Sequence, residues 1–158
     1  MAIQVKRLHP AAVLPTQGSS LAAGFDLAAC IEKPVIVRYG EPAILVPTGL
    51  AMHIGSESPN LMGMLVPRSG RGHKEGLVMG LTLGIIDADY MNQWFISVWN
   101  RGNKKDAEGN YLDITILPGE RIAQAIFVPV VHPEFEVVDE FSVQTERGLG
   151  GFGSTGSR

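Results

Sequence analysis

The chain has 158 residues, of which 45% are hydrophobic and 18% are charged, and its formal net charge is -3. This length fits one folded domain with its own core, and the composition argues against a disordered chain. Because the few basic residues form no stripe, the sequence argues against a nucleic-acid polymer as the partner.

Short apolar segments separated by glycine and proline dominate the chain, which contains 19 Gly and 10 Pro. They have the length of β-strands and are rich in β-branched and aromatic residues. In chain order they span 34–37, 44–46, 61–66, 81–83, 94–99, 113–117 and 125–131. No long stretch keeps an uninterrupted helical stripe. We therefore predict an all-β, jelly-roll-like sandwich or barrel with at most one short helix.

Residues 101–111 interrupt this pattern with Lys104, Lys105, Asp106 and Glu108. A charged segment between two apolar runs is typical of a loop on the surface. We predict a solvated hairpin between the strands expected on either side.

The end of the chain, residues 147–158, consists almost entirely of Gly, Ser and Thr. Residues 148–153 match the spacing G-x-G-x-x-G, but only five residues follow, so the helix that a dinucleotide site or a P-loop needs cannot form. We predict a β domain at 1–146 and a flexible tail at 147–158. By composition this tail is an ordinary disordered terminus. Phe152 is the exception, because a large apolar ring in a solvated tail is unfavourable unless it packs against another group.

Two polar segments adjoin predicted strands. Arg68, Ser69 and Gly70 offer a guanidinium, a hydroxyl and an open backbone, which are anion-binding groups. The same residues also fit a strand-ending turn with a surface arginine. Asp87 follows the apolar run 84–86, where a carboxylate either caps a turn or activates a water molecule.

Two further polar residues stand among apolar neighbours. Asp26 lies within the segment 23–27, and an acid in such surroundings usually pairs with an arginine. Gln124 enters an apolar run, so its amide needs partners and is either structural or directed at a ligand. The four histidines have no spacing that indicates a metal cluster.

Taken in chain order, five segments resemble the five motifs of the trimeric dUTPases. They are residues 23–27, 67–70, 84–90, 118–124 and 147–156, and residues 96–102 also resemble bacterial members. This resemblance spans most of the chain. It implies an enzyme that hydrolyses dUTP to dUMP and pyrophosphate, which limits uracil incorporation into DNA and supplies dUMP for dTMP synthesis.

The resemblance implies a role for each matching residue. Asp87 would be the general base for the water that attacks the α-phosphorus, and Asp26 would support the site through an arginine or the water shell of a metal. Phe152 would stack on uracil and Tyr90 would pack under deoxyribose. The full set of substrate-binding residues would be Arg68, Ser69, Gly70, Leu81, Ile85, Ile86, Tyr90, Gln124, Arg147, Phe152, Gly153, Ser154 and Thr155.

The resemblance also implies a homotrimer with three sites at its interfaces. Each site would draw its fifth motif from a different subunit than its third, so that residues 147–158 complete a neighbour's site. Mg²⁺ would be the cofactor, held by the triphosphate oxygens and water without a direct protein ligand.

Three features depart from the family pattern. Leu81 stands where bacterial members commonly carry Asn, which removes one side-chain contact near the base. Asn92 stands where the family usually has Gly, and we expect the turn to form because Asn tolerates positive φ. The segment 101–111 is longer than in compact bacterial members and has no assigned role.

Two alternatives stay open. A dCTP deaminase shares this fold but needs a glutamate at the position that aligns with Trp99. The other alternative is a trimer that binds nucleotide as a regulator, or docks a partner protein through its extra loop, without turnover.

The cellular location is indicated by what the sequence lacks. Cys30 is the single cysteine, so there is no disulfide framework and a reducing compartment is the default. The first residues lack the apolar core of a signal peptide, and no apolar run has the length of a membrane span. We therefore expect a cytoplasmic protein with no membrane partner.

Overall fold

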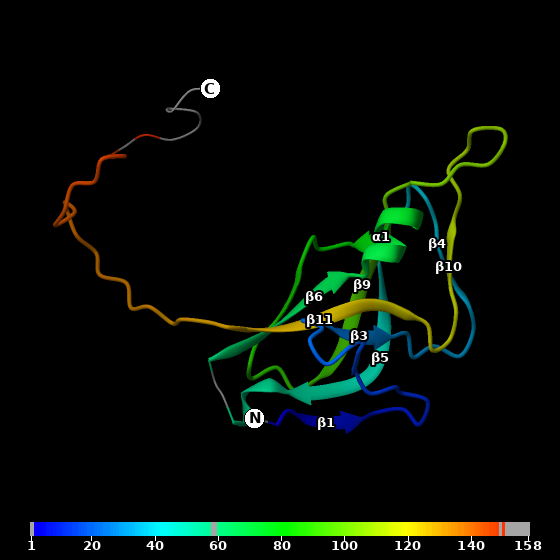
Figure 1. Cartoon of the computed structure of the whole chain (residues 1–158), viewed down its shortest axis with the longest axis horizontal. Helices are drawn as coiled ribbons and strands as arrows, with labels where there is room; N and C mark the ends of the chain where they lie inside the picture. Colours follow the sequence, from blue (N-terminus) through cyan, green and yellow to red (C-terminus); the bar gives the residue numbers. More distant parts are fainter. Residues whose placement is uncertain (1, 58–59, 149, 151–158) are drawn as a thin grey trace.

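Two antiparallel β-sheets pack against each other and form the body of the molecule (Figure 1). The computed structural model describes residues 2–57, 60–148 and 150. The first sheet has the order β1-β5-β9-β7, with the bounds Gln4–Arg7, Ile44–His53, Gln93–Asn100 and Leu77–Met79. The second has the order β2-β3-β11-β6-β8, with the bounds Thr16–Gln17, Phe25–Ala28, Arg121–Pro129, Leu61–Pro67 and Gly84–Ile86.

Three smaller sets of residues complete the described elements. Strands β4 and β10 pair separately and span Val35–Val37 and Ile114–Ile116. One α-helix, α1, spans Ser69–Glu75, and a single 3-10 turn, η1, spans Ile54–Ser56. Within the described part of the chain, no helix is long and apolar enough to cross a membrane.

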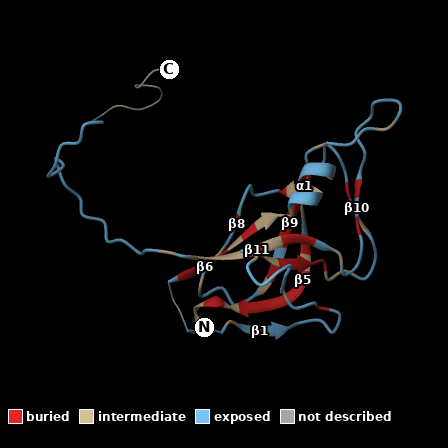
Figure 2. Ribbon diagram, in the orientation of Figure 1, coloured by how far each residue is buried: buried red, intermediate tan, exposed pale blue. Residues whose placement is uncertain are grey.

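The core lies between the two main sheets, where Figure 2 shows the buried parts of β5, β9 and β11. In β9 the side chains of Trp94, Ile96 and Val98 are buried, whereas Phe95 is exposed. Successive strand residues point to opposite faces, so this pattern turns one face of β9 towards the core. Trp94 is 0% exposed and its ring lies 6.5 Å from that of Phe127 in the opposite sheet.

The prediction of an all-β, jelly-roll-like sandwich with at most one short α-helix is confirmed. One predicted strand, at 81–83, is wrong. Those residues form an exposed turn, and β8 begins only at Gly84. Thr82 has a φ of 64°, which is incompatible with an extended strand and explains why the apolar run does not pair.

The strand predicted at 44–46 is the first part of the much longer β5. A register shift between Pro47 and Ala51 lets the strand continue past Gly49, whose φ is 68°. Residues 50–53 pair with β1, so β5 extends over residues that the sequence pattern did not predict as a strand. Gly49 lies against Cys30, and burial raises the pKa of the Cys30 thiol.

The hairpin predicted at 101–111 is confirmed, and it leaves β9 as an exposed excursion before β10. Lys105 and Tyr111 form an isolated bridge, and the Lys105 ammonium lies 4.4 Å from the centre of the Tyr111 ring. At the tip, hydrogen bonds from Asn110 to the Asp106 carboxylate lower the pKa of Asp106. The charges therefore organise the loop as well as solvate it.

Residues 131–148 leave the body after β11 as an extended, exposed segment (Figure 1). Several of their large apolar side chains have little contact with the rest of the chain. Phe135 is 93% exposed and Val137 is 99% exposed. Exposed apolar side chains in such number are a usual mark of a surface that another molecule covers.

Candidate active site

A buried carboxylate joins residues from three of the five motif segments. Asp26 on β3 is only 6% exposed. Its Oδ1 accepts hydrogen bonds from Arg68 Nε at 2.9 Å and from Gln124 Nε2 at 3.1 Å. Its Oδ2 accepts a hydrogen bond from Arg121 Nη1 at 3.1 Å. These four residues, which we call the Asp26 cluster, leave neither carboxylate oxygen without a donor.

The sheet register explains why residues so far apart in sequence meet. Gln124 of β11 stands directly opposite Asp26 of β3, and Ala123 stands opposite Pro67 of β6. Directly paired residues in an antiparallel sheet hold their side chains about 5 Å apart. Arg68 follows Pro67, the last residue of β6, so three neighbouring strands deliver the cluster.

The expectation that Asp26 pairs with an arginine is confirmed, and so is the expectation that the Gln124 amide has a partner. Arg121 is a member of the cluster that the sequence reasoning did not single out. Its signal was its place in the same segment as Gln124, three residues earlier. Arg121 also accepts, through its carbonyl, a hydrogen bond from Arg68 Nη1 at 3.3 Å.

Arg68 precedes a helix rather than a turn. Ser69 and Gly70 are exposed in the first turn of α1, and Arg68 is its N-terminal cap residue. The interpretation as a strand-ending turn is therefore wrong. Only the side chain of Arg68 among these three reaches the Asp26 cluster, and Ser69 and Gly70 keep their polar groups on the surface.

Asp87 lies directly after β8, as predicted, and it is exposed. Its carbonyl accepts a hydrogen bond from Tyr90 N at 3.2 Å, so residues 87–90 form a turn. Among the described residues, no hydrogen bond or ion pair reaches the Asp87 carboxylate. It borders a pocket of about 460 Å³ that also contains Met62 and His132.

Strand register separates Asp87 from the Asp26 cluster. In the pairing of β8 with β6, Ile86 stands opposite Gly63, which brings Asp87 level with Met62. Arg68 lies at the other end of β6, six residues further along. A strand advances about 3.3 Å per residue, so the two groups are about 20 Å apart within one chain.

The residues expected to read the base lie on and beside β8. Ile85 is exposed and Ile86 packs against the core, while Leu81 in the preceding turn is 67% exposed. Leu83 N donates to Leu81 O at 2.7 Å, which closes a tight turn centred on Thr82. A positive φ at a β-branched residue is strained, and such strain is common at binding sites.

Tyr90 ends this segment; the residue is 40% exposed and its hydroxyl donates to Gln93 O at 3.2 Å. Positive φ is not needed at Asn92: among the described non-glycine residues only Thr82 has one. Instead, the Asn92 side chain accepts a hydrogen bond from Gln93 N at 2.7 Å. The turn forms by this side-chain contact.

The predicted tail residues are only partly described. Arg147 is exposed and donates to Gly150 O at 3.0 Å. Phe152, Gly153, Ser154 and Thr155 lie outside the described residues.

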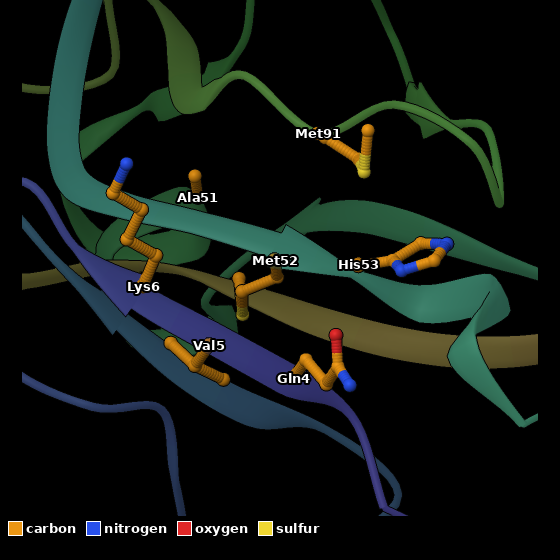
Figure 3. A pocket seen from close by; sticks show the side chains of 7 residues that line it. All are labelled: Gln4, Val5, Lys6, Ala51, Met52, His53 and Met91. Carbon is orange, nitrogen blue, oxygen red and sulfur yellow. The ribbon is translucent and has the colours of Figure 1, made fainter.

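A second pocket, of about 340 Å³, lies on the face of β1 and β5 and is shown in Figure 3. In that view Lys6 and His53 lie on the side of the strands that faces Met91. None of the residues predicted for the active site lines this pocket. It therefore has no place in the site built from the Asp26 cluster and Asp87.

The donor groups of the described residues bear on how a magnesium ion could be held. Mg²⁺ prefers hard oxygen ligands and often takes several from phosphate and water. In the described residues no three His, Cys, Asp or Glu side chains gather as a metal cage. Both Asp26 oxygens already accept hydrogen bonds. These groups fit an ion that arrives with a triphosphate better than one held directly by side chains.

Comparison with known proteins agrees with this geometry. A family model described as dUTPase matches residues 11–156. The chain is 50% identical over 158 residues to a deoxyuridine 5'-triphosphate nucleotidohydrolase of Escherichia coli O45:K1, with 98% of this chain and 97% of that protein covered.

Two solved structures are also similar. One is the Staphylococcus bacteriophage 80alpha dUTPase with dUPNHPP, at a TM-score of 0.80 and 30% identity, covering 98% of each chain. The other is a mutant dUTPase from phage phi11 of S. aureus, at a TM-score of 0.73 and 25% identity, covering 90% of this chain and 100% of that one. Its description mentions the coordination of a structural Mg(II) ion. The match over nearly the whole sequence shows that the chain belongs to the dUTPase family.

Proposed function

We propose that this protein hydrolyses dUTP to dUMP and pyrophosphate. The observation that carries the proposal is the Asp26 cluster, because it joins residues of the first, second and fourth family motifs through hydrogen bonds of about 3 Å. In the cell this reaction limits uracil incorporation into DNA and supplies dUMP for dTMP synthesis.

Asp87 is the general base of the proposed reaction. Its carboxylate takes a proton from a water molecule, whose oxygen forms a new bond to the α-phosphorus. The bond from the α-phosphorus to the bridging oxygen of the β-phosphate breaks, and pyrophosphate leaves with that bond's electron pair. An exposed carboxylate with no partner among the described residues is free to accept this proton.

The phosphate chain is held by Arg68, Ser69, Gly70 and Gln124. Asp26 does not contact substrate in this scheme but fixes the directions of Arg68 and Gln124, since it accepts hydrogen bonds from both. Holding charged donors in place before the substrate arrives lowers the cost of stabilising charge in the transition state.

The base and the sugar are recognised along β8 and its turns. Backbone groups near Ile85 and Ile86 read uracil, and Tyr90 packs under deoxyribose. The exposed ring of Tyr90 is anchored by its hydroxyl, so its position is fixed before binding. Leu81 contributes no polar group, so recognition at this position depends on the main chain.

The working enzyme is a homotrimer with sites between subunits. Support for this comes from the distance of about 20 Å between Asp87 and Arg68 along β6, because one α-phosphate cannot contact both groups of a single chain. A second subunit would bring its Asp26 cluster to the Asp87 of the first.

The segment after β11 is the proposed link between subunits. Val131, Phe135 and Val137 are almost fully exposed. Each body offers an open apolar pocket of about 400 Å³ bordered by Val5, Phe25 and other residues, which suits such side chains. Residues 147–158 then form a tail that closes a neighbour's site, with Phe152 on uracil and Arg147, Gly153, Ser154 and Thr155 over the phosphates. In this proposal residues 1–146, including the segment after β11, belong to the β domain.

Mg²⁺ is the proposed cofactor, and the triphosphate oxygens and water would hold it without a direct protein ligand. When bound, the ion neutralises charge on the phosphate oxygens. The protein itself supplies the arginines that share this task. The expected location, the cytoplasm, stays a prediction from the sequence.

The decisive experiment measures pyrophosphate release, with magnesium, from dUTP, dCTP, dTTP and UTP separately. Release from dUTP alone is the expected result. Binding of nucleotide without release would favour a regulatory trimer, and release of ammonia from dCTP would favour a deaminase. Trp99 argues against the deaminase, because an indole cannot replace a catalytic carboxylate.

A further inference from the structure

Helix α1 is not stable without contacts from outside the helix. It has seven residues, two of which, Gly70 and Gly72, are glycine, and its N-cap residue, Arg68, makes no side-chain capping hydrogen bond. Helices this short are unstable in isolation, and glycine lowers helix stability further. Contacts from other parts of the fold must therefore fix the helix that begins with Ser69.

The hairpin that follows β9 supplies contacts at the C-terminal end of α1. Arg101 donates from Nη2 to Gly72 O at 3.2 Å and from its backbone N to Gly76 O at 3.0 Å. Asn103 Nδ2 donates to His73 O. The last carbonyls of a helix have no partner inside the helix, so these donors satisfy groups that would otherwise be free.

Arg71 attaches the middle of the helix to the opposite side. Its guanidinium lies 2.6 Å from Glu75 and 3.2 Å from Glu120, and it donates to Thr115 O at 3.0 Å. The Arg71 side chain is only 16% exposed, so water screens these contacts little. Glu120 directly precedes Arg121, which belongs to the Asp26 cluster. The contact between Arg71 and Glu120 therefore links the helix to that cluster.

We propose that Arg71, Arg101 and Asn103 form a helix clamp that holds α1 so that Arg68, Ser69 and Gly70 keep the geometry needed to bind phosphate. This inference rests on the proposed function and deepens it, because the clamp residues do not contact substrate themselves. It also gives a role to the base of the hairpin at 101–111, which the catalytic scheme leaves unused.

The clamp is tested first with Asn103→Asp, which keeps the shape of the side chain, removes its N–H donor and places a negative charge beside helix carbonyls. We expect hydrogen exchange of the α1 amides to quicken about tenfold. We expect the KM for dUTP with magnesium to rise about tenfold while kcat changes less than about twofold. Asn110→Ala is the matched control, because among the described residues the Asn110 side chain donates only to Asp106, at the tip of the same hairpin.

A second substitution tests whether helix stability is the cause. A Cβ at Gly72 would meet only ordinary contacts, the nearest at 3.6 Å, and alanine favours helix. Gly72→Ala added to Asn103→Asp should therefore restore both the slow exchange of α1 and the low KM. Arg101→Lys, which keeps the charge near the helix end, should have a smaller effect on both than Arg101→Ala.

Two results would overturn the clamp. One is unchanged α1 exchange in both Asn103→Asp and Arg101→Ala; the other is faster exchange with an unchanged KM. If the unaltered protein released no pyrophosphate from dUTP, the proposed function would fail instead, and the exchange data would still decide whether the three residues hold α1.

Discussion

The two ends of β6 carry the two halves of the proposed chemistry, and they differ in one respect. At the Arg68 end, Asp26 is buried and each of its oxygens accepts hydrogen bonds from within the chain. At the other end, Asp87 is exposed, and no described side chain pairs with its carboxylate. The Arg68 end is completed by contacts within a single chain, whereas the Asp87 end leaves its carboxylate open to groups from outside the chain.

This difference follows from what each end has to do. Groups that bind phosphate act through fixed charge, so they gain from being held rigidly before the substrate arrives. A general base needs access to water and an unoccupied lone pair, so a carboxylate whose oxygens already accept hydrogen bonds within the chain could not act as one. The contrast predicts that substitutions at the two ends of β6 impair the enzyme in different ways.

Asp87→Asn should have the largest effect. Loss of the base should lower kcat by about a thousandfold while the affinity for a non-hydrolysable dUTP analogue stays within about twofold. Pyrophosphate release and calorimetric binding measure the two quantities. Asp89→Asn, in the same turn, is the control and should remain active. Loss of analogue binding in Asp87→Asn would contradict the base assignment.

Removal of residues 147–158 should come next. We expect a trimer that is still folded but whose turnover of dUTP falls by about a hundredfold, because the site is no longer closed. Size-exclusion chromatography and pyrophosphate release test both parts. Removal of residues 157–158 alone should leave turnover unchanged. Full turnover in the longer truncation would show that the tail has no part in the site.

Asp26→Asn should affect binding and stability together. Arg68 and Arg121 would lose their charged partner. We expect KM to rise about tenfold and the free energy of unfolding to fall by about 2 kcal/mol. Urea unfolding and steady-state kinetics provide the measurements. Asp113→Asn, whose Oδ1 accepts one bond from Tyr39 N in an exposed place, is the control. If both substitutions behaved alike, the cluster would have no special role.

Gly49→Ala should change stability with the least effect on catalysis. A Cβ there would lie 2.6 Å from Cys30 Sγ, and φ is 68°, so we expect about 3 kcal/mol of destabilisation. Gly40→Ala has a similar φ of 80° but nothing within 4 Å, so it should cost about 1 kcal/mol. Equal losses in thermal unfolding would mean that the contact with Cys30 contributes nothing.

Particular residues show where sequence reasoning succeeded and where it failed. Asp26 was expected to meet an arginine and does, because burying a charge without a partner is too costly in any fold. The strand expected at 81–83 failed, because an apolar run carries no information about the φ of 64° at Thr82. The position of the one short helix, α1, was also missed, since its two glycines argue against a helix and its support comes from distant residues.

The sequence by itself determined the fold class, the family and the order of the five motifs. Apolar periodicity and the identities of polar residues at strand ends are local properties, and they can be read without coordinates. Only the tertiary structure decided that Arg121 belongs with Asp26, that Arg101 and Asn103 reach α1, and that Asp87 lies at the far end of β6 from Arg68. These facts depend on strand register and chain reversal, which bring together residues whose separation in sequence carries no sign of their contact.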